Sequence, residues 1–194
     1  MKLSVNKEQI IEGLQKAAAI IPAKAGAAYL RSIWLKAEKG SLSIMATDAN
    51  IEFTGRYPAE VKQPGLIGVQ GRAFVDLVRQ LPAGVLQLTL DESTGNLLLE
   101  QGRRTYKLPV SGAEWFQNFS EFPAESPVTW SGDFLQDVLD RVVFCISDDD
   151  ATDAITCLYM KPCGNGRIDV CGLNGHQFAL ISFTHDDLLS LIHI

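Results

Sequence analysis

The chain opens with a helix signal that returns later in the sequence. Between residues 7 and 21 the apolar residues recur at helical spacing and form one stripe: Ile10, Ile11, Leu14, Ala17, Ala18 and Ile21. Asn6 stands three residues before Gln9, a variant of the capping box whose side chain can satisfy free N–H groups at a helix start, and Pro22 ends the pattern. About 125 residues later a matching stripe predicts an equivalent helix over 131–143, at Phe134, Leu135, Val138, Leu139, Val142 and Val143.

The segments after each helix repeat as well. Alternation of apolar and polar residues predicts two hairpins, the first from strands 32–37 and 41–46 and the second from strands 155–160 and 167–171. Each hairpin leads into a polar turn, 46–50 in the first case and 172–176 in the second. Helix, hairpin and polar turn in the same order predict two copies of one module.

The first copy continues where the second stops. A second helix is predicted over 72–81, followed by strands over 85–90, 97–100 and 105–108, and the counterpart of this helix would lie past Ile194. We therefore expect a truncated chain, with a complete first domain and its linker over 1–127 and the N-terminal half of a second domain over 128–188. Residues 189–194 are suspected to be a non-native tail, because they read like a translated sequencing adapter; a native apolar strand is the alternative.

Composition narrows the class of protein. Apolar residues make up 46% of the chain and charged residues 21%, and no apolar run is long enough to cross a membrane, so we expect a globular protein without a membrane partner. The first residues lack the apolar stretch of a secretory signal, which favours a cytoplasmic location. The net charge is −6, with +1 over residues 1–127 and −7 over residues 128–194, so any contact with nucleic acid must come from a locally basic face.

Four segments, in order, carry a family resemblance: LSIMATDANIEF, GLIGVQGRAFVDLVRQLP, LLLEQGRRTYKLP and IDVCGLNGHQFALISF. Together they resemble the β sliding clamp of bacterial DNA polymerase III. The resemblance implies an α+β DNA clamp (processivity) fold, built from repeated helix plus antiparallel sheet modules. It also implies a replication processivity factor without catalysis or cofactor, whose full-length homodimer encircles double-stranded DNA. Such a ring slides because phosphate contacts carry no sequence information.

The resemblance assigns residues to three surfaces. The DNA-contacting positions are Lys24 and Arg72, and the positions at the dimer interface are Arg103 and Leu108. A pocket for a short apolar peptide of the polymerase and clamp loader subunits matches Ile155, Leu173, Gly175, His176 and Phe178. The alternative for the two cations is a solvated surface charge, and for Leu108 an ordinary strand core position.

The pocket departs from the usual family pattern. Leu173 stands where Thr is typical, Asn174 where Asp is typical and Gln177 where Arg is typical, so the wall is more apolar and less charged. Because the remaining wall belongs to segments absent here, we expect this fragment to bind partners weakly and not to form a ring.

Other classes of protein fit less well. The chain lacks the signatures of phosphate-binding loops, zinc proteases and serine hydrolases, so no catalytic residue is assigned. Cys157, Cys163, Cys171 and His176 lack the paired spacing of structural zinc sites, and Asp148–Asp150 with Asp153 lack the alternation of a calcium loop, so no metal is assigned. A catalytic cysteine paired with His176 or His185 would need to be a thiolate, which is usually stabilised by nearby positive charge. The acidic surroundings here do not favour this alternative. The remaining alternative is a binding protein with the same duplicated module and no ring.

Overall fold

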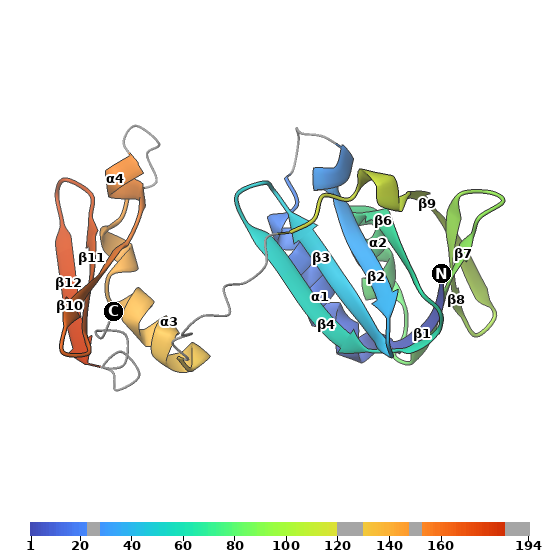
Figure 1. Cartoon of the computed structure of the whole chain (residues 1–194), viewed down its shortest axis with the longest axis horizontal. Helices are drawn as coiled ribbons and strands as arrows, with labels where there is room; N and C mark the ends of the chain where they lie inside the picture. The colour runs from blue at the N-terminus through green and yellow to red at the C-terminus, as the bar shows by residue number, and fades with distance from the viewer. Residues whose placement is uncertain (23–27, 120–129, 148–152, 185–194) are drawn as a thin grey trace. The chain divides into compact units, whose positions relative to one another are not determined.

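The computed structural model describes residues 1–22, 28–119, 130–147 and 153–184, and the chain divides into two compact units, Met1–Ser120 and Glu121–Ile194 (Figure 1). Three predictions lie outside the described residues: the domain boundary after residue 127, Lys24, and the tail over 189–194. No helix among the described residues is long and apolar enough to cross a membrane.

The first unit is one antiparallel sheet with two helices. Its elements are β1 (Lys2–Asn6), α1 (Lys7–Ile20), η1 (Ala28–Arg31), β2 (Ser32–Glu38), β3 (Ser41–Thr47), β4 (Glu52–Pro58), β5 (Glu60–Gln63), β6 (Gly65–Gln70), α2 (Gly71–Gln80), β7 (Val85–Asp91), β8 (Asn96–Gln101), β9 (Arg104–Ser111) and η2 (Ala113–Trp115). The strand order is β4-β3-β2-β6-β9-β8-β7-β1-β5, so the two end strands, β4 and β5, are joined by Ala59 alone. The predicted class of helix plus antiparallel sheet is confirmed.

Helix α1 buries the predicted stripe but begins differently from the prediction. Ile10, Leu14, Ala17 and Ile21 are all buried in the core. The Asn6 side chain makes no capping hydrogen bond. Instead the Lys7 backbone N–H donates to the Gly84 carbonyl over 3.0 Å, and the Glu8 carboxylate accepts from the Gly84 N–H over 3.1 Å. The capping-box prediction was wrong because the helix start is satisfied by a loop distant in sequence.

The ends of the two helices are also held together by a side chain. The Lys7 ammonium donates to the carbonyl oxygens of Arg79, over 3.0 Å, and Leu81, at the C-terminal end of α2. A cation at this end interacts favourably with the helix dipole and satisfies carbonyls that have no partner within the helix. These contacts fix α1 against α2.

The buried face of α1 contains a glycine that leaves room for an aromatic ring. A Cβ at Gly13 would overlap the phenol of Tyr57, which comes from β4. Tyr57 packs against the core of the first unit, and Gly13 is itself buried. The helix therefore approaches β4 closely at this point because residue 13 has no side chain.

The second unit pairs a short helix with a small sheet. Its elements are α3 (Gly132–Asp140), η3 (Val143–Cys145), α4 (Asp153–Thr156), β10 (Tyr159–Gly164), β11 (Arg167–Leu173) and β12 (Phe178–Thr184). Buried Val138, Val142, Ile168 and Val170 form its core, with Trp130, Phe134 and Phe183 packed against them. The Ser131 hydroxyl accepts from the Phe134 N–H over 3.2 Å and caps α3.

Two boundaries in this unit differ from prediction. The strand expected over 155–160 begins only at Tyr159, because Ile155 belongs to the helical turn α4 and its carbonyl accepts from the Ser147 N–H over 2.8 Å. Cys157 therefore lies outside the strand and is exposed. Val143, expected on the buried stripe, is 42% exposed because α3 ends at Asp140 and a 3-10 turn follows. Short alternations do not distinguish a strand from a helical turn.

The second unit repeats the helix and hairpin of the first, and it also repeats one polar turn. In the first unit the Asp48 carboxylate accepts from the N–H groups of Asn50 and Ile51, both over 2.8 Å. In the second, the Asn174 side chain oxygen accepts from His176 over 3.0 Å and Gln177 over 2.8 Å. The residue that follows Asp48 and the one that follows Asn174 both have a positive φ, 82° at Ala49 and 85° at Gly175. The repeated geometry supports the predicted duplication.

Of the two side chains that accept the hydrogen bonds of these turns, Asp48 is a carboxylate that acid can protonate, whereas Asn174 is an amide. The N–H groups of Ile51 and Asn50 lower the pKa of Asp48 from its ordinary 3.8. A lowered pKa contributes stability that is present above the unfolded-state value and is lost as the pH falls through the folded-state value. We expect Asp48→Asn to reduce the fall in melting temperature between about pH 6 and about pH 3, measured by circular dichroism, because an amide keeps the turn without titrating.

The control for this prediction is Glu92→Gln, which removes an exposed acid of the same unit. Equal acid sensitivity in the Asp48→Asn and Glu92→Gln variants would contradict the prediction.

Candidate functional site

Helices α1 and α2 enclose a hollow whose rim carries cations. Its volume is about 340 Å³, and its lining residues are Gln15, Ala18, Ala19, Arg72, Val75, Asp76 and Arg79. Arg72 lies in the first turn of α2, and its guanidinium donates a long hydrogen bond of 3.4 Å to the Ile21 carbonyl at the end of α1. The small side chains of Ala18 and Ala19 leave the hollow open.

Arg79 is a second cation of this hollow that the sequence interpretation missed. It lies about two helical turns after Arg72, so both residues occupy the same face of α2. One guanidinium nitrogen lies 3.3 Å from an oxygen of Asp76, and the Arg79 side chain is 63% exposed. An exposed pair of this kind contributes little to stability, so the guanidinium can turn toward an anion. The spacing along α2 was the signal that could have identified it.

The second unit has an apolar hollow on its sheet. Its volume is about 350 Å³ and its lining residues are Cys157, Leu158, Tyr159, Cys171, Leu173 and Phe178. The register explains the assembly, because Leu173 of β11 is paired with Phe178 of β12 and Cys171 is paired with Tyr159 of β10. Phe178 is 61% exposed and Leu173 45% exposed. Large exposed apolar side chains gathered in a hollow are typical of a docking site.

The structure brings together part of the predicted pocket. Leu173 and Phe178 line the hollow, whereas Ile155, Gly175 and His176 are not among its lining residues. Ile155 is half-buried in α4, and Gly175 and His176 form the turn between β11 and β12. The part of the wall from Cys157 to Tyr159 was not predicted. The sequence suggested a strand from Ile155 onward, whereas β10 begins only at Tyr159.

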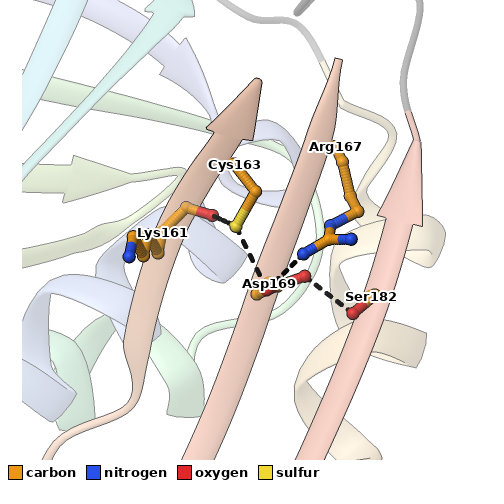
Figure 2. A network of polar contacts seen from close by, with 5 residues as sticks. All are labelled: Lys161, Cys163, Arg167, Asp169 and Ser182. Atoms are coloured by element: carbon orange, nitrogen blue, oxygen red, sulfur yellow. Dashed lines mark hydrogen bonds and ion pairs between the residues drawn. The ribbon is translucent and has the colours of Figure 1, made fainter. Parts of the chain in front are cut away.

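Asp169 lies two residues before Cys171 on β11, hence on the same face of the sheet as the hollow, and it is the centre of the polar network in Figure 2. Asp169 accepts hydrogen bonds from the Ser182 hydroxyl over 2.7 Å, the Cys163 thiol over 3.1 Å and the Arg167 guanidinium over 3.2 Å. The Cys163 sulfur also lies 3.5 Å from the Lys161 carbonyl oxygen. The bonds from Ser182 and then Cys163, with the nearby Arg167 charge, lower the pKa of Asp169. This carboxylate is occupied in joining three strands and is not poised as a general base.

Strand β9 presents an edge that fits pairing with another chain. It pairs with β8 from Asn96↔Pro109 to Gln101↔Arg104, but with β6 only through Val110 and Ser111. Within the described part of the chain, the other edge of Arg104–Pro109 therefore lacks a strand neighbour. Arg103 is exposed in the preceding turn. Leu108 is half-buried and packs against the core of the first unit, so its packing fits the core alternative as well as the interface.

The residues considered for metal binding do not form a metal site within the part of the chain that the structure describes. No group of three or more His, Cys, Asp or Glu side chains suited to a metal occurs among the residues that the structure describes. Cys157 and Cys171 line the apolar hollow, and the Cys163 thiol donates to Asp169. Asp148–Asp150 and His185 lie outside the described residues.

Comparisons with known proteins agree on one family. Residues 1–120 match the family described as DNA polymerase III beta subunit, N-terminal domain. The chain is 26% identical over 184 residues to the beta sliding clamp of Caulobacter vibrioides, covering 93% of this chain and 50% of that protein. It also resembles the crystal structure of the DNA polymerase sliding clamp from Caulobacter crescentus, with a TM-score of 0.88, 25% identity, and coverage of 95% of this chain and 51% of that one.

A more distant relative shows the same fold. The crystal structure of the DNA polymerase sliding clamp from Bacillus subtilis gives a TM-score of 0.90 at 18% identity, covering 96% of this chain and 50% of that one. The chain thus spans about half the length of the curated relatives it matches.

Proposed function

The chain belongs to the DNA polymerase III β subunit family, and on that premise we propose that it serves as part of a DNA sliding clamp, a processivity factor that encircles duplex DNA and tethers the replicative polymerase. The match over residues 1–120 carries this proposal, and the repeated Asp48 and Asn174 turns support it. The proposal includes a first domain over 1–127 and the start of a second over 128–188. The proposal also includes a cytoplasmic location, in keeping with a role in bacterial replication.

The proposed mechanism needs no reacting group. A closed ring is retained on DNA by topology, so the protein has to neutralise phosphates without gripping bases. In the proposal Lys24 and Arg72 face the duplex, and Arg79 adds a second cation on the same helix. A Lys or Arg contact of this kind is independent of sequence, which is what sliding requires. No cofactor or metal takes part.

The apolar hollow is the proposed docking site for a short peptide of the polymerase and clamp loader subunits. Its exposed Leu173 and Phe178 offer apolar area that a peptide anchor can cover, and burial of such anchors supplies most of the affinity of small interfaces. Ile155, Gly175 and His176 border this site in the proposal. Arg103 and Leu108, beside the open edge of β9, take part in the contact with a second chain of the full-length homodimer.

The decisive experiment compares circular and linear DNA. The complete gene product is loaded onto nicked circular duplex by its clamp loader, and the retained protein is measured before and after linearisation. We expect retention on circles and loss from the linear ends. Retention on both forms would instead indicate the alternative, a binding protein with the same duplicated module and no ring.

The hollow between α1 and α2 yields a separate prediction. We expect Arg72→Ala to weaken duplex DNA binding by the complete gene product and to reduce the slope of log affinity against log salt by about 1, because one phosphate contact is lost. Titrations by fluorescence anisotropy at several salt concentrations measure both effects.

The matched control is Lys62→Ala, which removes the same charge from β5, where Lys62 lies 3.9 Å from Glu60. If both variants lose affinity equally, the effect reflects net charge, and the assignment of Arg72 is wrong.

A further inference from the structure

The apolar hollow of the second unit contains two thiols as well as apolar side chains. Cys157, in the short segment between α4 and β10, and Cys171, in the middle of β11, both line it. Neither the proposed docking role nor the family match assigns anything to these thiols. A nucleophilic atom at the wall of an apolar hollow can hold a reagent covalently while the hollow binds its apolar part.

The four cysteines differ in how far a reagent can reach them. Cys145 is only 1% exposed, and the Cys163 thiol is engaged in a hydrogen bond to Asp169. Cys171 is half-buried between β10 and β12. Cys157 is exposed, and its sulfur lies 3.9 Å from the Thr156 hydroxyl oxygen, a weak contact that leaves the thiol accessible. Accessibility and an apolar binding surface therefore coincide at Cys157.

The walls of the hollow suit an aromatic group. Tyr159 and Phe178, each 61% exposed, and Leu173, 45% exposed, provide ring and aliphatic surface beside Cys157. A volume of about 350 Å³ accommodates a single aromatic ring. We propose that Cys157 is a reversible modification site for apolar disulfides, whose retained half occupies the hollow lined by Cys157 and Cys171.

The reaction is thiol–disulfide exchange. The Cys157 thiolate attacks one sulfur of the disulfide, a new bond forms between Sγ and that sulfur, and the original S–S bond breaks. The other half leaves as a thiolate and takes up the proton that Cys157 gave to solvent. The disulfide itself is the oxidant, and an excess of free thiol reverses the step.

The adduct has a consequence that rests on the proposed function. If the hollow receives the apolar peptide of a replication partner, a group attached to Cys157 excludes that peptide, and reduction restores binding. An apolar disulfide would then release the partner without changing the fold of the clamp.

The test uses the 194-residue chain and two disulfides of different polarity, the neutral aromatic 2,2′-dithiodipyridine and the charged glutathione disulfide. Release of 2-thiopyridone, or of glutathione, gives the rate of exchange, and peptide mapping by mass spectrometry identifies the modified cysteine. We expect the aromatic reagent to modify Cys157 first. The ratio of the exchange rate with 2,2′-dithiodipyridine to the rate with glutathione disulfide should be about tenfold higher in the folded chain than in the unfolded chain, because the hollow binds the aromatic ring.

Three variants make the test selective. Cys157→Ser should abolish the fast phase, whereas Cys163→Ser, which changes a thiol of the same sheet outside the hollow, should leave it intact. Leu173→Asn should keep Cys157 reactive but remove the preference for the aromatic reagent, because a neutral polar amide of similar size replaces an exposed apolar wall without adding charge beside the thiol. Circular dichroism of each variant confirms that the sheet is retained.

Two results would overturn the inference. One is a fast phase that persists in Cys157→Ser, and the other is a preference for the aromatic reagent that is no greater than in the unfolded chain. Neither result depends on peptide docking, so failure of the proposed function, seen as no binding of a partner peptide to unmodified protein, is distinguishable from failure of the modification site.

Discussion

Replacing Gly13 by Ala is expected to destabilise the first unit by about 2–3 kcal/mol. The added Cβ would overlap the phenol of Tyr57, whose ring is packed between α1 and the sheet. Intrinsic propensity predicts the opposite sign, because Ala favours a helix interior over Gly by about 1 kcal/mol. The structure therefore predicts that packing overrides propensity at this position. Urea unfolding followed by circular dichroism measures the difference.

A second substitution distinguishes these two terms. In a Tyr57→Ala background the overlap is gone, so Gly13→Ala should become neutral or stabilising, and the double-mutant cycle should show strong coupling. If Gly13→Ala costs the same in both backgrounds, the contact with Tyr57 is not the cause.

Gly172→Ala is expected to destabilise the second unit by about 2–3 kcal/mol. A Cβ there would lie 2.7 Å from the Val142 carbonyl oxygen and 3.1 Å from Leu158 Cδ2. The backbone oxygen has little freedom to move, because Val142 is buried in the small core of this unit. Faster hydrogen exchange in β11 and β12, with unchanged exchange in the first unit, is the expected result.

The control for this substitution is Gly132→Ala in the first turn of α3, where a Cβ would have no atom within 4 Å. It should leave exchange in β11 and β12 unchanged. Equal loss of protection in the two variants would show that Gly172 is not required for close packing.

The sequence predicted those features of the fold that depend on residues close together in the chain. The stripe from Ile10 to Ile21 became buried because helical spacing alone places these residues on one face. The start of α1 escaped prediction because its hydrogen-bond partner is Gly84, which only the tertiary fold brings near Lys7. Ser131, whose partner Phe134 lies within the same helix, is the matching case in which a local cap does form.

The candidate site was predictable to a similar extent. Leu173 and Phe178 were assigned to a pocket through the resemblance, and they do line the apolar hollow. Cys157 escaped assignment because its segment alternates like a strand, whereas the chain forms a helical turn before β10. Arg79 was not assigned because the DNA-contacting positions were taken from the resemblance, which supplied only Lys24 and Arg72, although its place on the same face of α2 as Arg72 was readable from the spacing.

The place of β1 in the sheet has a consequence for synthesis on the ribosome. Strand β1, Lys2–Asn6, lies between β5 and β7, which both follow it in the chain, so its two neighbours are complete only once Gln63 and Asp91 have been translated. Until then the neighbouring strands that pair with β1 are missing, although Leu3 and Val5 are both buried in the finished protein. Exposed apolar strand surface favours aggregation, so this interval is when a chaperone at the exit tunnel has most to protect.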